Sequence, residues 1–340
     1  MLYNSIDLFA GVGGLTEGMH RAGFTTRLAI EIVKEAVIGY KLNHTKSQVL
    51  QKDIRSIKKE EITTLLNHEP IHLLAGCPPC QGFSSIRRLN RGSVDDHRND
   101  LVLEYLRFVK EHLPYTIMME NVPALREYSL FTQLVTELKS IGYHIDYDVV
   151  NIKNYGVPQS RRRLVMVGSL LAPIKIIRGS SEKVTVRDVL ENIESIDVTT
   201  DPIHKITATH TQKVMERIKL TPKNGGSSKD LPSSYMLKCH ERENVGFNDV
   251  YGRLRWDDYS TTITGGCLNP SKGRFLHPEE DRVITPREAA LLQSFPKDYK
   301  FPLNISKQSL ALLIGNALPP KFSYIQSENI RKHLDQNLPD

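Results

Sequence analysis

The sequence has few cysteines and no long hydrophobic run. Its 340 residues contain four cysteines, too few for a disulfide framework at this length. No segment approaches the ~20 apolar residues that a membrane-spanning helix needs. The first residues, MLYNSIDLFAGVGG, lack the basic start and long apolar core of a signal peptide. We therefore expect a cytoplasmic protein with no membrane partner.

Basic residues slightly outnumber acidic ones. The chain has 45 Lys and Arg against 39 Asp and Glu, a net charge of +6, and 39% of its residues are hydrophobic. That hydrophobic fraction supports a substantial core, which we expect in two lobes. The positive charge suggests a polyanionic partner such as nucleic acid. Many basic proteins bind no nucleic acid, so charge alone does not identify the partner.

Apolar runs alternate with amphipathic stretches through the first half of the chain. The predicted strands are NSIDLFA, TRLAIEI, SQVLQKDI, IHLLAG, YTIMMENV, HIDYDVVNI and RLVMVGS. The predicted helices lie at 14–22, 34–43, 58–67, 100–113 and 130–142. This alternation predicts an α/β fold with a doubly wound, Rossmann-like parallel sheet over roughly residues 1–170.

The character changes between residues 171 and 284. Clusters such as TPKNGGSSKDLPSS replace long periodic segments, so we expect a smaller, mostly β or irregular lobe. Thr285, Pro286 and Glu288 then form the start of a helix with a capping box. Further helices are predicted at 306–314 and 320–334. We expect this C-terminal segment to pack back on the first lobe.

The run IDLFAGVGG places a strand before a glycine-rich turn and a helix. Gly11 and Gly13 allow close backbone approach to a ligand, although a purely structural turn is the alternative. The GxGxxG fingerprint of dinucleotide-binding folds fails, because Thr16 occupies the third glycine position. An adenosyl cofactor without phosphates therefore fits better. Glu31 can then accept both ribose hydroxyls, and Asp53 can accept from an adenine amino group.

Cys77 and Cys80 lie in the segment GCPPCQGFS. A zinc site needs four ligands, and the sequence has no second CxxC pair to complete one with Cys77 and Cys80. A CxxC after a strand also occurs in thioredoxin-like redox proteins, whose fold is much smaller. A structural cysteine or a nucleophile is favoured, and the Pro-Pro stiffens the turn that carries Cys80.

Several of these residues follow predicted parallel strands. Glu120 ends YTIMMENV, so it should emerge at the same edge as the turn after IHLLAG. Ligands of open α/β sheets bind at the carboxyl edge. We therefore expect the glycine turn, Glu31, Asp53, Cys80 and Glu120 to converge there.

Two basic segments complete the pattern. The loop after Cys80 can close on a phosphate backbone, although a solvated surface loop is the alternative and is favoured for the segment alone. Its arginines are Arg87, Arg88, Arg91 and Arg98. In QSRRR, Arg161 and Arg163 share one side of an extended strand and can grip a carbonyl, carboxylate or phosphate. A solvated face is again the alternative.

Together these motifs resemble the DNA cytosine-5 methyltransferases of bacterial restriction–modification systems. DLFAGVGG, GCPPCQGFS, ENV, QSRRR, RVITPREAALLQSFP and GNALPP resemble that family's signatures in its order, leaving about 171–250 without a counterpart. The resemblance implies a class I fold that uses S-adenosyl-L-methionine to methylate C5 of a cytosine in a short duplex DNA sequence. It implies no metal.

The resemblance also implies roles for individual residues. Cys80 would attack C6 of cytosine, Glu120 would hydrogen-bond and protonate N3, and Arg163 with Arg161 would hold the base carbonyl. The implied cofactor contacts are Phe9, Gly11, Gly13, Glu31, Asp53, Ile54, Pro78, Leu101 and Asn316. The implied DNA contacts are Gln81, Ser84, Arg87, Arg88, Arg91 and Thr264. Cys77, on the strand side of the Pro-Pro, is expected to be structural.

The resemblance divides the chain by function. A catalytic and cofactor-binding domain would comprise 1–170 plus 285–340, and a target recognition domain would comprise 171–284. Candidates for base contacts, chosen by residue type, are Lys223, Asn224, Lys229, Lys238, His240 and Arg242. The family implies a flipped target base and a monomer on double-stranded DNA. It also implies a cognate restriction endonuclease without a stable complex, and association with the nucleoid when DNA is bound.

Two related functions stay open. An RNA cytosine-5 methyltransferase of the same fold is one, although the Cys-Phe-Thr signature usual in that branch is absent here. A non-catalytic DNA-binding relative is the other, although Cys80, Glu120 and Arg163 are intact. Activity on transfer RNA but not duplex DNA would indicate the first, and absent cofactor binding the second.

Overall fold

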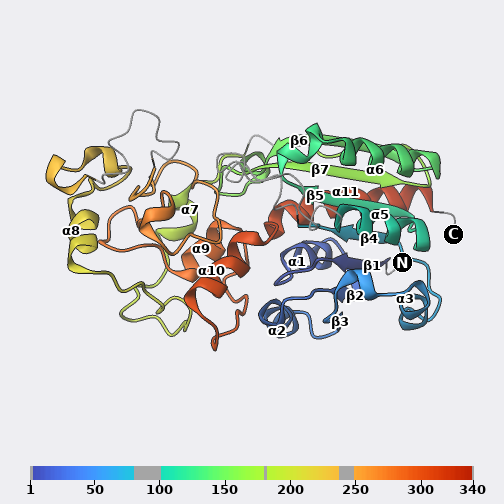
Figure 1. Cartoon of the computed structure of the whole chain (residues 1–340), viewed down its shortest axis with the longest axis horizontal. Coiled ribbons are helices and arrows are strands. Elements are labelled where there is room, and N and C mark those ends of the chain that lie inside the picture. The colour runs from blue at the N-terminus through green and yellow to red at the C-terminus, as the bar shows by residue number, and fades with distance from the viewer. Residues whose placement is uncertain (1–2, 80–100, 180–181, 237–248, 339–340) are drawn as a thin grey trace. The chain divides into compact units, whose positions relative to one another are not determined.

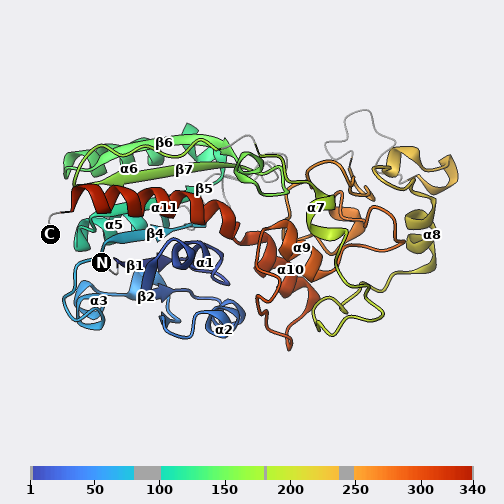
Figure 2. The same ribbon diagram turned by 180° about the vertical axis from the view of Figure 1, so that it is seen from behind.

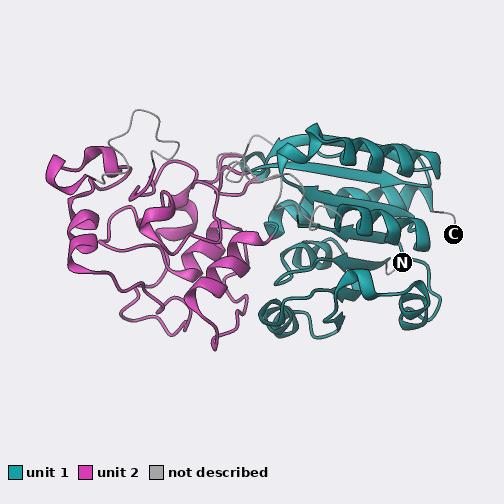
Figure 3. Ribbon diagram, viewed as in Figure 1, with its two compact units in different colours: residues 1–155, 162–180, 318–340 teal, residues 156–161, 181–317 magenta. Residues whose placement is uncertain are grey.

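Figure 1 shows a computed structural model that describes residues 3–79, 101–179, 182–236 and 249–338. The chain divides into two compact units (Figure 3). The first unit consists of Met1–Tyr155, Arg162–Ser180 and Leu318–Asp340, and the second of Gly156–Arg161 and Ser181–Ala317. Among the described residues, no helix combines the length and apolar character that a membrane span requires.

The first unit is built on a seven-stranded sheet in the order β3-β2-β1-β4-β5-β7-β6. Its strands are β1 (Tyr3–Leu8), β2 (Phe24–Ile30), β3 (Gln48–Leu50), β4 (Leu73–Gly76), β5 (Thr116–Asn121), β6 (His144–Asn151) and β7 (Arg162–Ser169). Strands β1 to β5 pair in parallel, and β7 runs antiparallel to both β5 and β6. The predicted α/β sheet is confirmed.

The strand after Ser47 is shorter than predicted. Strand β3 ends at Leu50, whereas the apolar run SQVLQKDI extends to Ile54. The Asp53 side chain accepts a hydrogen bond from the backbone N–H of Arg55 and so caps a short 3-10 helix, Ile54–Ser56. Aspartate favours such local caps over strand pairing, which explains the early end of the strand.

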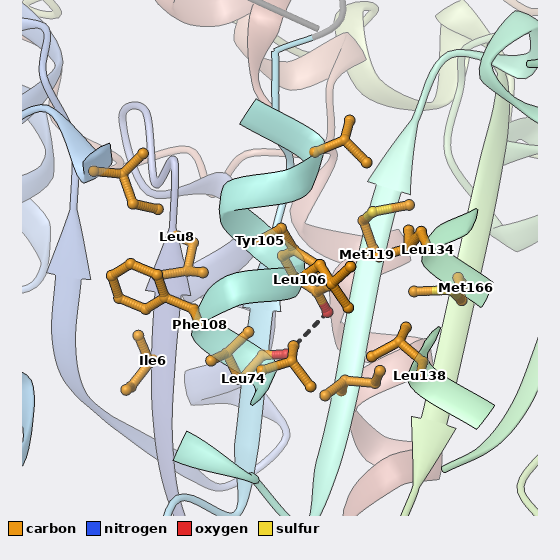
Figure 4. Packing of buried hydrophobic residues seen from close by; sticks show 14 of the residues in the cluster. Ile6, Leu8, Leu74, Tyr105, Leu106, Phe108, Met119, Leu134, Leu138 and Met166 are labelled. Atoms are coloured by element: carbon orange, nitrogen blue, oxygen red, sulfur yellow. Dashed lines mark hydrogen bonds between the residues drawn. The ribbon is translucent and has the colours of Figure 1, made fainter. Parts of the chain in front are cut away.

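Helices cover both faces of the sheet. On one face α3 (Lys59–Leu65), α5 (Leu101–His112) and α6 (Ser129–Ser140) contribute to one large core cluster with the strands (Figure 4). The other face carries α1 (Gly14–Arg21), α2 (Lys34–Asn43) and α11 (Pro320–Asn337), with α11 in front in Figure 2. Every residue of β4 and β5 is buried, as expected for parallel strands covered on both sides.

The last helix packs on the first unit, as predicted. The hydroxyl of Ser323 donates to the backbone carbonyl of Leu15 at 2.7 Å. Gly18 faces the same contact, where an added Cβ would lie 2.4 Å from Cβ of Ser323. Any larger side chain at position 18 would therefore push α11 away from α1.

The second unit is irregular in its described residues, which is one of the two alternatives expected for this lobe, and the mostly β alternative does not hold for those residues. Its helices are α7 (Val186–Leu190), α8 (Gln212–Leu220), α9 (Pro286–Leu292) and α10 (Lys307–Asn316). Its β pairing is limited, in the described part, to isolated bridges such as that between Arg253 and Leu276. Arg253 is fully buried and donates to the carbonyls of Thr221, His277 and Ile218. Two of these carbonyls, those of Ile218 and Thr221, lie at the C-terminal end of α8, where a helix leaves its last carbonyls without partners of its own.

The packing boundary also differs from the predicted one. Helix α9 begins with the predicted capping box at Thr285, but residues 285–317 belong to the second unit. The hydroxyl of Thr285 lies 2.7 Å from Nδ1 of His204, and Arg287 pairs with Asp201. These contacts hold α9 to the preceding residues of its own unit. The expectation that the whole C-terminal segment packs on the first lobe is therefore right for 318–338 only.

Candidate active site

The strand order of the first unit reverses between β1 and β4. Strands β2 and β3 continue to one side of β1, while β5 continues to the other side of β4. Leu8 pairs with both Ile30 and Gly76, and Gly76 pairs with Met119. The segments that follow these residues consequently lie along one carboxyl edge, at a topological switch point where α/β sheets bind ligands.

The glycine turn after β1 has an unusual backbone. Phe9, Gly11 and Gly13 have φ angles of 60°, 55° and 96°. A non-glycine residue in this left-handed region costs about 1–3 kcal/mol, and such strain is common at binding sites. Among the described residues, and apart from the chain neighbours of Gly11, no atom lies within 4 Å of the position that a Cβ on Gly11 would occupy. The turn therefore presents backbone next to open space, which is the requirement for close approach of a ligand.

Glu31 holds this turn directly. Its Oε2 accepts from the backbone N–H of Gly11 at 2.8 Å, and its Oε1 accepts from that of Val33 at 2.8 Å. Each carboxylate oxygen can accept a second hydrogen bond. The structure thus brings Glu31 and Gly11 together as expected and leaves Glu31 capacity for two ligand hydroxyls.

Three further predicted cofactor residues of the first unit, Asp53, Ile54 and Leu101, lie in different surroundings. Asp53 accepts from Nε and Nη2 of Arg55 at 3.0 and 2.9 Å, and these hydrogen bonds lower the pKa of Asp53. One lone pair of its carboxylate remains for a ligand donor. Ile54 and Leu101 are buried in the core cluster. Their roles at the cofactor stay predictions.

Asn121 is a site residue that sequence reasoning missed. Its Nδ2 donates to the backbone carbonyl of Pro78 at 3.0 Å, and its Oδ1 accepts from the N–H of Val122 at 2.8 Å. Asn121 therefore ties the Pro-Pro turn after β4 to the end of β5. The signal was available, because ENV places a second polar residue beside Glu120 at the end of a buried strand.

The change Asn121→Asp should show whether the hydrogen bond from Asn121 to Pro78 positions the turn without affecting cofactor binding. The aspartate keeps the acceptor for Val122 but replaces the donor to Pro78 with an oxygen that repels the carbonyl. For the methyl transfer that the sequence resemblance implies, we expect kcat to fall about 10- to 100-fold through misplacement of the turn, with the Kd of the implied cofactor changed less than about threefold. Steady-state kinetics with equilibrium binding would test this. An unchanged kcat would show that this hydrogen bond does not position the turn.

Glu120 and Arg163 form a partly shielded ion pair. Nε of Arg163 lies 2.7 Å from Oε1 of Glu120, and the two side chains are only 17% and 9% exposed. They come from the paired antiparallel strands β5 and β7. The site therefore offers a carboxyl group and a guanidinium side by side at the carboxyl edge.

Arg161 and Arg163 have different partners. Arg161 is buried, and its Nη1 donates to the carbonyls of Ile263 and Gly315 at 3.1 and 3.0 Å, within the second unit. Arg161 precedes β7, whereas Arg163 lies within that strand. Their joint role in holding a base carbonyl stays a prediction.

Several predicted site residues lie outside the described part of the chain. They are Cys80, Gln81, Ser84, Arg87, Arg88 and Arg91, together with Lys238, His240 and Arg242. Cys77 is described and partly buried, directly after β4. Cys267 is buried, which raises the pKa of its thiol to about 12. Within the described ranges no group of three or more His, Cys, Asp or Glu side chains could hold a metal.

The predicted DNA and cofactor residues of the second unit fall into two groups. Thr264 and Asn316 are exposed, and they are neighbours in space: a Cβ on Gly315 would lie 2.2 Å from the carbonyl carbon of Thr264. By contrast, Lys223 pairs with Asp281, and Oδ1 of Asn224 accepts from the backbone N–H of Trp256 at 2.8 Å. Lys223 and Asn224 thus help to fold the unit, whereas Lys229 is exposed.

A buried carboxyl group lies below the glycine turn. Asp7 is fully buried, and its Oδ2 accepts from the hydroxyl of Thr16 at 2.6 Å. Burial raises the pKa of Asp7 from its ordinary 3.8 to about 7, with the nearby Glu31 charge adding to the shift. A folded chain therefore holds this proton more tightly than an unfolded one.

The pH dependence of stability should reveal this group. Because the folded pKa is raised, the contribution of Asp7 to the free energy of unfolding is fully present below about pH 4 and is lost as the pH rises through about 7. Asp7→Asn lacks this dependence. We expect the difference in unfolding free energy, wild type minus Asp7→Asn, to fall by about 1.4 kcal/mol for each unit by which the pH rises between these two limits. Denaturant titrations at pH 4 to 8 would measure it, and a constant difference would contradict the raised pKa.

Comparisons with known proteins agree with these motifs. The sequence model of the family described as C-5 cytosine-specific DNA methylase matches residues 3–332. The chain is 33% identical to the type II methylase M.HgiDII of Herpetosiphon aurantiacus, over 97% of this chain and 95% of that protein. It is 31% identical to the type II methyltransferase M1.HphI of Haemophilus parahaemolyticus, over 96% of this chain and 86% of that protein.

Solved structures show the same fold. A prophage-encoded protein of E. coli superimposes with a TM-score of 0.76 at 27% identity, covering 98% of this chain and 99% of that one. The Dnmt2 methyltransferase of S. pombe superimposes with a TM-score of 0.69 at 19% identity, covering 98% and 99%, which supports the fold alone. The family match spans nearly the whole chain and includes both units. The chain belongs to the C-5 cytosine-specific DNA methylase family.

Proposed function

We propose that the chain transfers a methyl group from S-adenosylmethionine to C5 of a flipped-out cytosine in a short duplex DNA sequence, through a covalent bond between Cys80 and C6. The observation that carries the proposal is the arrangement at the carboxyl edge. There Glu120, next to the last residue of β5, pairs with Arg163 of β7, and Asn121 joins β5 to the segment that precedes Cys80.

The residues of the glycine turn suit S-adenosylmethionine. The open space beside Gly11 and the unused acceptor capacity of Glu31 fit a ligand that carries ribose hydroxyls and no phosphates. The residues that would hold it are Phe9, Gly11, Gly13, Glu31, Asp53, Ile54, Pro78, Leu101 and Asn316. When bound, this cofactor supplies an electrophilic methyl group on a positively charged sulfur.

The protein must make C5 of cytosine nucleophilic, because the aromatic ring is a poor nucleophile there. The Cys80 thiolate adds to C6 while Glu120 donates a hydrogen bond and a proton to N3, which raises the electron density at C5. Arg163 pairs with Glu120 and holds the base carbonyl. After C5 has taken the methyl group, which leaves the sulfur of the cofactor as a neutral thioether, the C5 proton passes to a base and the N3 proton returns to Glu120. Expulsion of the Cys80 thiolate then restores the aromatic ring.

The target base must leave the duplex to reach these groups. Enzymes that act on bases in this way spend a few kcal/mol on unstacking, which phosphate contacts offset. We propose Gln81, Ser84, Arg87, Arg88, Arg91 and Thr264 for the contacts to DNA. We propose that residues within 171–284, including exposed Lys229, recognise the target sequence.

We further propose the associations that this activity entails. The chain would act as a monomer on double-stranded DNA in the cytoplasm and lie at the nucleoid while bound. A restriction endonuclease that recognises the same sequence would be its functional partner, without a stable complex between them.

Transfer of a labelled methyl group in vitro tests the proposal. The purified chain, labelled S-adenosylmethionine and a mixed-sequence DNA duplex should yield 5-methylcytosine in the duplex, whereas transfer RNA should remain unlabelled. Label found in RNA alone, or no label with either substrate, would overturn the assignment to DNA.

A further inference from the structure

Thr16 occupies the position where a dinucleotide-binding fold has its third glycine. In this structure the Thr16 side chain makes hydrogen bonds that a glycine could not make. The Thr16 hydroxyl donates to Oδ2 of Asp7 at 2.6 Å and lies 2.9 Å from the hydroxyl of Tyr40. Since the single hydroxyl hydrogen of Thr16 is directed to Asp7, Tyr40 must donate to Thr16. A fully buried chain of hydrogen bonds therefore runs from α2 through α1 to the end of β1.

A second contact reaches the turn itself. Nε2 of His44, just beyond α2, lies 3.2 Å from the carbonyl oxygen of Gly13. A carbonyl only accepts, so this nitrogen carries the hydrogen. Burial lowers the pKa of His44 to about 3, so its ring is neutral. The ring of His44 also packs on that of Tyr40, with centroids 4.7 Å apart.

These contacts fix both ends of the glycine turn. Asp7 precedes the turn and Thr16 follows it, so their hydrogen bond links β1 directly to the start of α1. His44 donates to the Gly13 carbonyl, and Glu31 accepts from the Gly11 N–H. The left-handed backbone at Phe9 persists only if its surroundings determine it.

We propose that Thr16, Tyr40 and His44 are positioning residues, which hold the glycine turn in the conformation that binds the cofactor. They act through Asp7 and Gly13 and need no contact with the ligand. The inference rests on the proposed function, because it assumes that the glycine turn binds S-adenosylmethionine. It assigns to Thr16 a role that a glycine at the same position cannot perform.

Equilibrium binding of S-adenosylmethionine and S-adenosylhomocysteine to the full chain tests the inference. Thr16→Val keeps the shape of the side chain and removes both hydrogen bonds, so we expect both ligands to bind about 10- to 100-fold more weakly. Thr16→Ser keeps the hydroxyl and should restore binding to within about threefold of wild type. Tyr40→Phe leaves the Thr16–Asp7 bond intact and should cost about three- to tenfold, which provides a milder variant if Thr16→Val folds poorly.

Matched controls separate this role from general stability. Thr63→Val in α3 removes a hydroxyl whose partner among the described residues is the carbonyl of Lys59 in the same helix, and it should leave binding unchanged. DNA binding without cofactor should stay within about twofold of wild type in every variant. If Thr16→Val binds cofactor normally, or if Thr16→Ser fails like Thr16→Val, the positioning role is wrong and the proposed function stands. If wild type and Thr63→Val bind no cofactor, the proposed function fails and this inference with it.

Discussion

Cys80→Ser is expected to reduce methyl transfer by roughly 10⁴-fold or more while leaving the cofactor Kd nearly unchanged. A serine hydroxyl is far less acidic than a thiol and does not supply the anion that must add to C6. The cofactor contacts that we propose for the glycine turn and Glu31 come from other residues and should persist. Single-turnover kinetics and equilibrium cofactor binding on the same preparation would measure both effects.

Cys77→Ser is the matched control for this variant. The two cysteines flank the same Pro-Pro, but Cys77 directly follows the last residue of β4 and is expected to be structural. Its replacement should retain most of the methyl transfer. If methylation persists in Cys80→Ser, or if only Cys77→Ser loses it, the assignment of Cys80 as the nucleophile is wrong.

Glu120→Gln should slow formation of the covalent bond to C6 by about 10²- to 10⁴-fold, the range that a positioned acid normally contributes. A glutamine can still accept from Arg163, but it has no proton to transfer to N3. The loss should appear in kcat, with small changes in the Kd values for cofactor and DNA. Trapping of the adduct with a 5-fluorocytosine duplex would report the covalent step itself.

Glu137→Gln provides the comparison for Glu120→Gln. Glu137 lies on the outer surface of α6 and pairs with Lys110, so its neutralisation removes one charge of the same unit without touching the carboxyl edge. Turnover should stay normal in Glu137→Gln. Near-normal turnover in Glu120→Gln would remove its proposed role in proton transfer.

The sequence predicted the sheet well because its signal is local. Each buried parallel strand appears as a short apolar run, and the switch between β1 and β4 follows once those strands are ordered. The carboxyl edge could be predicted for the same reason, since Glu31 and Glu120 directly follow or end their strands. The glycine turn was identified by residue type, and its φ angles agree.

What the sequence could not predict depends on partners distant in the chain. The donor of Asn121 to Pro78, the carbonyls that Arg161 binds and the hydroxyl chain through Thr16 all join residues that no periodicity relates. The second unit shows the same limit. There, contacts such as that between buried Arg253 and the carbonyl of Thr221 join residues far apart in the chain, and no alternating pattern marks them.

The most direct test is base-resolution mapping of 5-methylcytosine in DNA from cells that express either the wild type or Cys80→Ser. We predict one short sequence motif methylated at C5 in the wild type and unmethylated in the variant. That result would establish the reaction, the nucleophile and the target sequence together. The same motif methylated in both samples would contradict the covalent role of Cys80, and no methylated motif in either would contradict the proposed function.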